Sequence, residues 1–175
     1  MSARQTLPRR WFMTDERLGD RLWQAIERLP QGAGIVFRHY SLDAAHRRSL
    51  FEKVRQKTRD RELLLLIAGP SEQAEMWGAD GSHGRNSGAG IRSAPAHDLA
   101  EIRAAETAGA DLVFLSPVFP TRSHPEAATL GPNRFAELAG QTQLPVIALG
   151  GMNEARFAAL DGAYGWAGID AWSGD

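Results

Sequence analysis

The sequence contains no cysteine among its 175 residues, so disulfides, thiolate metal sites and a cysteine nucleophile are all excluded. It also lacks an excess of charge of either sign, because 20 Lys and Arg residues stand against 21 Asp and Glu residues. Electrostatic capture of nucleic acid or of an anionic membrane requires a strong basic excess. We therefore expect neither nucleic acid nor a membrane surface as a partner.

Long apolar runs are missing too. The longest, Leu63 to Ala68, has the length of a strand and falls far short of the roughly 18 residues of a membrane span. The segment from Met1 to Arg10 does not contain the apolar stretch of a secretory signal. We expect a cytoplasmic protein, and the chain length suits a single domain that spans residues 1–175.

Short apolar runs alternate with helical patterns along the chain. Strands are expected at residues 11–15, 34–38, 63–68, 79–83, 91–93, 111–119, 145–149 and 166–172. Helical spacing fills most of the intervals, as from His97 to Ala108, where Gly109 ends the pattern. About eight strands alternating with helices predict a parallel sheet, and eight is the number that closes a (β/α)₈ barrel.

The length of the chain is the objection to a barrel, since such folds usually take about 250 residues and rarely fewer than about 200. The rival is an open doubly wound sheet, which often carries a glycine fingerprint after its first strand. Here the first strand runs into Thr14-Asp15-Glu16-Arg17 instead. We therefore predict a compact α/β fold, a TIM barrel in which the helices after strands four and eight are reduced or missing. The wall left bare by the last helix would be covered by a homo-oligomer contact or by the N-terminal segment.

The active site of such a barrel lies at the C-terminal ends of its strands. Gly150-Gly151 follow the seventh strand, where backbone N–H groups often hold phosphate and glycine permits close approach. An ordinary strand-to-helix turn is the alternative interpretation. Arg38 ends a buried strand, where an unpaired charge is costly, so it either pairs with a carboxylate such as Asp15 or binds an anionic ligand.

Histidines are the other candidates for chemistry. His83 and His124 fall on segments that face the expected site, where they could serve as acid, base or phosphate donor. His39 alternates outward from Arg38 and is expected to be structural, and His46 falls within a helix and is expected on the surface. No set of residues with metal-ligand spacing argues for zinc.

The strand ends, taken in order, resemble the thiamine-phosphate synthase and thiazole tautomerase family. They are similar to the family's GADGVH, S-x-H-x-x-x-E, GP-x-FPT-x-TK and PVxAxGG motifs. The segments that carry this resemblance are Gly78-Ala79-Asp80-Gly81-Ser82-His83, Ser93 with His97 to Glu101, Ser116 to His124, and Pro145 to Gly151. The resemblance extends from Trp11 to Trp172, and the last two motifs are fairly specific because their order and spacing are preserved.

The resemblance implies a (β/α)₈ barrel that joins a pyrimidine pyrophosphate to a thiazole phosphate, releases pyrophosphate and uses Mg²⁺. It implies that His83 lines the pyrimidine pocket and that Gly150 and Gly151 hold the thiazole phosphate. The residues that it places against the pyrophosphate, or against its metal-bound form, are Arg38, Ser93, Thr121 and Ser123.

Several positions depart from the family pattern. The two metal-binding acidic positions align with Gly69 and near Gly88, so both Mg²⁺ carboxylates are absent. Tyr40 and His124 stand where the family has lysines, and Asp170 stands where it has a serine near the thiazole phosphate. Each of these changes opposes the binding of pyrophosphate or of a phosphate dianion.

Three activities follow as hypotheses. The first is the family's synthase reaction, because the motif order is preserved. The second is a divergent, inactive or repurposed member that binds a small phosphate or a heterocycle. The third is a thiazole tautomerase, which needs neither pyrophosphate nor Mg²⁺; its histidine after the sixth strand is replaced by Ser116-Pro117, so His83 or His124 would have to supply its acid–base group.

Overall fold

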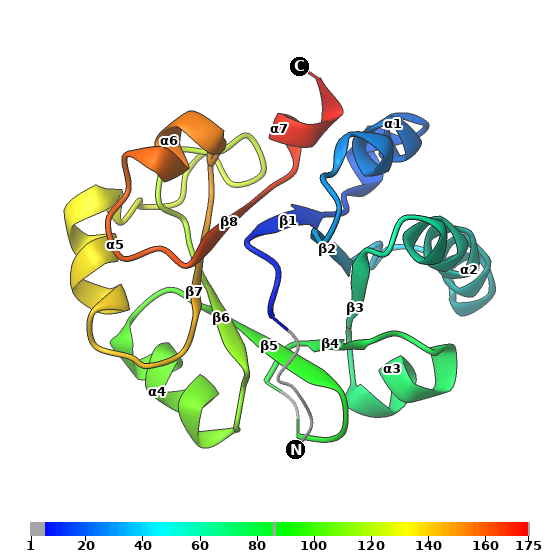
Figure 1. The fold of residues 1–175 in the computed structure, drawn as a ribbon, viewed down its shortest axis with the longest axis horizontal. Helices are drawn as coiled ribbons and strands as arrows, with labels where there is room; N and C mark the ends of the chain where they lie inside the picture. The colour runs from blue at the N-terminus through cyan, green and yellow to red at the C-terminus, as the bar shows by residue number, and fades with distance from the viewer. Residues whose placement is uncertain (1–5, 86, 175) are drawn as a thin grey trace.

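Eight parallel strands form a closed barrel in the order β1 to β8 (Figure 1). The structure is a computed structural model, and it describes residues 6–85 and 87–174. The ring closes where β8 pairs with β1, with Trp11 opposite Ala167. The strands are β1 Arg10–Met13, β2 Gly34–Phe37, β3 Leu64–Ala68, β4 Gly81–His83, β5 Ile91–Ala96, β6 Leu112–Leu115, β7 Val146–Leu149 and β8 Gly165–Gly168. The predicted TIM barrel is therefore confirmed.

Helices surround the barrel on its outer side (Figure 1). They are the 3₁₀-helix η1 Glu16–Leu18 and the α-helices α1 Arg21–Arg28, α2 Ala44–Asp60, α3 Ser71–Trp77, α4 Leu99–Thr107, α5 Gly131–Ala139, α6 Glu154–Ala158 and α7 Asp170–Ser173. In the part of the chain that is described, β4 leads to β5 without a helix and α7 has only 4 residues. The prediction that the helices after strands four and eight are reduced or missing is confirmed. None of the described helices is both long and apolar enough to cross a membrane.

Two predicted strands are too long. The strand expected at 166–172 ends at Gly168, because Trp172 turns back in α7 and buries its ring against Trp166. The strand expected at 111–119 ends at Leu115, shortly before Pro117, which has no N–H to donate to a neighbouring strand. The strand expected at 91–93 is longer than predicted and reaches Ala96.

Apolar side chains fill the barrel inside and outside. In β1, Trp11 and Met13 belong to the inner cluster, whereas Phe12 between them packs in the outer cluster beneath the helices. Residues that alternate along a strand point to opposite faces, so a strand covered on both faces must be apolar throughout. This explains the uninterrupted apolar run of β3, in which every residue is buried.

The outer wall between β8 and β1 is covered by α7, which packs against α1. Trp172 of α7 stacks on Trp166 of β8 with ring centroids 4.8 Å apart, and its indole Nε1 donates to the carbonyl oxygen of Trp11 in β1 at 2.9 Å. Residues 6–9, the described part of the N-terminal segment, do not form this cover, contrary to one of our expectations. Leu7 packs against the inner cluster instead, and its carbonyl accepts a hydrogen bond from the Tyr164 hydroxyl at 2.7 Å.

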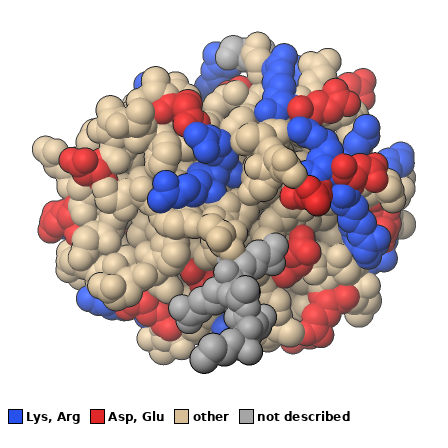
Figure 2. All heavy atoms as spheres, in the orientation of Figure 1, with Lys and Arg blue, Asp and Glu red and all other residues tan. Residues whose placement is uncertain are grey.

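Charged side chains of both signs are interspersed on the face shown in Figure 2, most densely on the side where α1 and α2 lie. This distribution agrees with the net charge of −1. On this face, neighbouring charges of opposite sign weaken the long-range field of the surface.

Candidate active site at the carboxyl ends of the strands

A cavity of about 730 Å³ opens where the strands end. It is lined by residues that directly follow or end strands, among them Arg38 after β2, His83 in β4 and Gly150 after β7. Of the residues predicted for the site, those that line the cavity are Arg38, His83, Thr121, Ser123, His124, Gly150 and Gly151. Ser93 lies behind this layer, fully buried, and reaches the cavity through His83.

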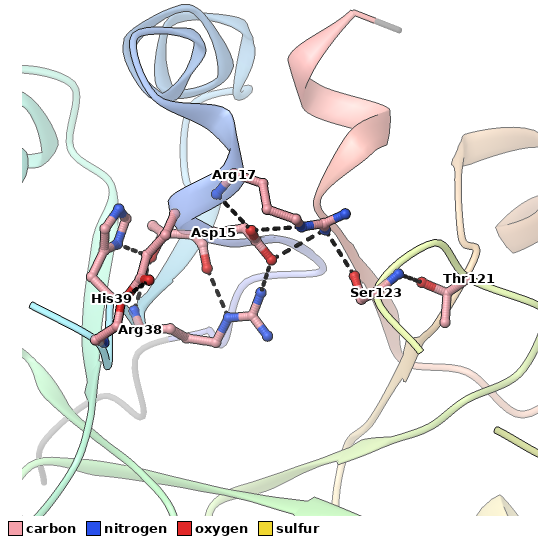
Figure 3. Close-up of polar contacts among 9 residues, drawn as sticks. Asp15, Arg17, Arg38, His39, Thr121 and Ser123 are labelled. Atoms are coloured by element: carbon pink, nitrogen blue, oxygen red, sulfur yellow. Dashed lines mark hydrogen bonds and ion pairs between the residues drawn. The ribbon is translucent and has the colours of Figure 1, made fainter. Parts of the chain in front are cut away.

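Arg38 is fixed to the end of β1 (Figure 3). Its Nε donates to the carbonyl oxygen of Thr14 at 2.7 Å, and its Nη2 donates to Oδ2 of Asp15 at 3.2 Å. The sequence left open whether Arg38 pairs with a carboxylate or binds a ligand. The pair with Asp15 is present, and the guanidinium still lines the cavity.

Asp15 holds two arginines at once. Arg17 donates to it through Nε at 2.8 Å, in addition to the bond from Arg38. Burial alone would raise the pKa of Asp15, but the hydrogen bonds from Arg17 and the charges of both arginines outweigh burial and hold this pKa below its ordinary value. Asp15 is therefore ionised at neutral pH and organises the positive charge at this edge.

Arg17 also connects β1 with the loop that follows β6 (Figure 3). Its Nη2 donates to the hydroxyl oxygen of Ser123 at 3.0 Å, and the backbone N–H of Ser123 donates to Oγ1 of Thr121 at 3.2 Å. Sequence reasoning missed Arg17, because nothing local to η1 indicates a contact with a residue 106 positions later. Arg17 thus fixes the loop that carries the Thr121 and Ser123 hydroxyls.

His83 is a neutral imidazole at the cavity wall. Its Nδ1 lies 2.8 Å from the Ser93 hydroxyl, and its ring meets Phe114 edge to face with centroids 5.1 Å apart. Burial, together with the nearby charge of Arg38, lowers the pKa of His83 to about 4. His83 therefore offers a ligand a hydrogen bond from an uncharged ring rather than a positive charge.

The other histidines have separate places. His39 is buried, its Nδ1 lies 3.0 Å from the Thr14 hydroxyl and its ring stacks on Phe37, so its predicted structural role is confirmed. His46 is exposed on α2, as predicted. His124 is exposed on the loop after β6, at the cavity edge.

The turn after β7 can be made only by glycine. Gly150 and Gly151 have φ angles of 98° and 60°, a region that favours glycine. A Cβ on Gly150 would lie 2.8 Å from Cα of Pro117, and one on Gly151 would lie 2.6 Å from the carbonyl oxygen of Pro120. The close approach that glycine permits is therefore used here by the loop after β6, which packs directly onto the turn.

Charged residues that the sequence did not single out also line the cavity. Arg122 and Arg156 join Arg38, so three guanidinium groups face one lining carboxylate, Asp170. Exposed Tyr40 stands at the rim as well. The balance of these charges favours an anionic ligand.

The described residues do not fit a magnesium site built by carboxylates. Within residues 6–85 and 87–174, no group of three or more His, Cys, Asp and Glu residues is placed to hold a metal ion. Glycines occupy both aligned positions, and a Cβ there would lie 2.7 Å from Oε1 of Gln73 at Gly69 and 2.6 Å from Cβ of Ser71 at Gly88. At the end of β3, Arg47 donates to the carbonyl oxygen of Ala68 at 2.8 Å and places a positive charge there instead.

Comparison with known proteins agrees with this geometry. Residues 11–172 match the family model described as thiamine monophosphate synthase. A putative thiamine-phosphate synthase 2 of Aquifex aeolicus is 34% identical, over 93% of this chain and 96% of its own length. A thiamine-phosphate synthase of Thiobacillus denitrificans is 32% identical, over 73% of this chain and 67% of its own.

Among solved structures, the thiamine phosphate pyrophosphorylase of Pyrococcus furiosus is similar to this chain with a TM-score of 0.79 and 25% identity. The similarity covers 97% of this chain and 88% of that one. The resemblance inferred from the strand ends is therefore confirmed by the family model, by a relative of nearly the same extent and by the fold. The chain belongs to the thiamine monophosphate synthase (TMP-TENI) family.

Proposed function

We propose that the chain is a transferase that joins a pyrimidine pyrophosphate to a thiazole phosphate and releases pyrophosphate. The observation that carries this proposal is the cavity at the strand ends, where three arginines, the hydroxyls of Thr121 and Ser123, and the Gly150-Gly151 turn come together. Both substrates are anionic, and the cavity has more positive than negative lining groups. Membership of the family supplies the reaction class.

The pyrophosphate end of the cavity is assigned to Arg38, Thr121 and Ser123. The hydroxyl oxygen of Thr121 accepts from the N–H of Ser123, and that of Ser123 accepts from Arg17, so both O–H groups remain able to donate. Negative charge grows on the pyrophosphate as it departs. Donors and a guanidinium that are fixed beforehand stabilise that charge without further reorganisation.

The heterocycle is assigned to the wall formed by His83. Ser93 engages Nδ1 of His83, so Nε2 is the ring nitrogen available to a pyrimidine. Because the pKa of His83 is about 4, the ring is uncharged at neutral pH and can pair with a polar edge of the base. His124, on the facing loop, is proposed to contact the phosphate end of a ligand, where the family has a lysine.

Magnesium is expected here only because the family uses it. The described residues do not build a carboxylate site for it. This same observation favours a second candidate, a divergent member that binds a phosphate or a heterocycle without catalysing the transfer. A tautomerase that uses His83 or His124 as its acid–base group belongs to this second class.

The test incubates the purified protein with pyrimidine pyrophosphate and thiazole phosphate, with and without Mg²⁺, and measures thiamine phosphate and pyrophosphate. Equal formation of both products supports the transferase, and an R38Q variant should reduce it. Calorimetric binding of thiamine phosphate without turnover supports the second candidate. Isomerisation of a thiazole phosphate in the absence of pyrimidine identifies a tautomerase. Absence of both binding and turnover contradicts both candidates, the tautomerase included.

A further inference from the structure

Arg156 in α6 lies directly against the Gly150-Gly151 turn. Its Nη1 donates to the carbonyl oxygen of Gly151, and its guanidinium carbon lies 4.5 Å above the centre of the Phe119 ring. The backbone N–H of Arg156 donates at 2.9 Å to the side chain of Asn153, the N-cap residue of α6. The side chain is therefore held by a carbonyl, an aromatic face and a capped helix start, although much of it is exposed.

These contacts leave N–H donors of the Arg156 guanidinium available for a ligand. In the described part of the chain, Nη1 is the nitrogen that is hydrogen-bonded, and no carboxylate forms an ion pair with Arg156. The planar group presents Nε and Nη2 along its remaining edge. Two parallel N–H donors on one edge match the oxygens of a phosphate group, and stacking on an aromatic ring keeps that edge in place.

Asp170 adds a negative charge to the cavity, and this charge opposes the binding of a phosphate group. It lines the same cavity from the start of α7. A carboxylate in this lining repels a phosphate dianion that enters the same cavity, and the repulsion grows as their separation and the effective dielectric decrease. A phosphate near the glycine turn thus requires a compensating positive charge, and Arg156 is the arginine that contacts this turn.

We propose that Arg156 binds the phosphate group of the ligand at the Gly150-Gly151 turn and thereby selects phosphorylated over unphosphorylated thiazole compounds. This inference rests on the proposed function, because it assumes that the cavity takes a thiazole moiety. It goes beyond that function by assigning the phosphate specificity to one side chain of α6.

The experiment compares the binding of thiamine phosphate and of thiamine by calorimetry to the wild type and to R156Q, R156K and R134Q. Arg134 on α5 is an exposed arginine paired with Glu137 and outside the cavity lining, so R134Q is the matched control. R156Q should weaken thiamine phosphate binding roughly 10- to 100-fold, the loss expected for a charged hydrogen bond, and change thiamine binding by less than about twofold. R156K should lose less, because it keeps the charge but not the planar edge.

The two compounds separate a phosphate contact from a structural role. Equal weakening of both compounds by R156Q would show that Arg156 only supports the loop, and this would overturn the inference. Unchanged binding of thiamine phosphate to R156Q would overturn it as well, while leaving the proposed function intact. A wild type that binds neither compound contradicts the proposed function, and the inference with it. Thermal unfolding of each variant checks that the fold is retained.

Discussion

His83 is the cavity residue whose burial has the largest consequence for charge. In the unfolded chain its pKa is near 6.5, whereas in the folded protein it is about 4. Between these values the unfolded state binds a proton that the folded state does not. The contribution of His83 to the free energy of unfolding therefore has its full value above about pH 6.5, and it decreases as the pH falls toward 4.

Replacement of His83 by Asn removes this titration. The free energy of unfolding of the wild type should fall between pH 6.5 and pH 4 by about 3 kcal/mol more than that of H83N. The measurement is urea unfolding at a series of pH values for both proteins. His39, whose pKa is also lowered, mainly by burial, is present in both and so does not contribute to the difference. Parallel pH profiles would contradict a neutral, half-buried His83.

Single residues at the site were predictable where the signal is local. Arg38, His83 and Gly150 each stand at a strand end, and the barrel periodicity alone brings strand ends together. Arg17 and Arg156 were not predictable in this way. Their roles depend on contacts with Ser123 and Phe119, which come from a loop distant in sequence, and neither periodicity nor composition encodes how that loop folds over the strand ends.

Individual helices depend on their first residues. The side chain of Asp98 accepts a hydrogen bond from the backbone N–H of Glu101 at 2.8 Å, so it caps α4 at a place outside the cavity lining. D98A should lower the free energy of unfolding by about 1 kcal/mol, because a backbone N–H in the first turn of α4 loses its acceptor. Urea denaturation followed by circular dichroism measures the difference.

The control for this cap is D98N, since asparagine is as good an N-cap as aspartate. D98N should therefore retain most of the stability that D98A loses. A D98A protein as stable as the wild type would mean that water replaces the cap at no cost, and that α4 is held by the packing of Ile102 and Ala105 alone.

For strands that are covered on both faces, the sequence predicts the type of element well and its ends less well. β3 is apolar throughout and was placed almost to the residue, whereas the ends of β6 and β8 were misplaced. The error at β8 arises because Trp172 is equally apolar in a strand or on a helix that packs back on the barrel. In the folded protein the Trp172 ring stacks on Trp166, and this contact favours the helix over a longer strand.

Closure of the barrel is the property that belongs to the whole molecule. Parallel strands are joined by hydrogen bonds from β1 to β8 and back to β1, so a weak junction at one place affects the entire ring. The junction between β8 and β1 is covered by α7, the shortest α-helix of the described residues. Its stability therefore depends on one large side chain, Trp172, which contacts both strands through Trp166 and the Trp11 carbonyl.

Substitution of Trp172 tests this dependence. W172A should lower the free energy of unfolding by about 3–5 kcal/mol, because a large buried ring is removed and the cavity left behind cannot collapse against rigid strands. W172F keeps an aromatic ring over Trp166 but leaves the Trp11 carbonyl without its donor, so it should cost about 1–3 kcal/mol. Urea unfolding of the two variants and the wild type gives both numbers. If W172A were as stable as W172F, the ring would contribute nothing to closure and the junction would be maintained by the strand pairing of β1 and β8 alone.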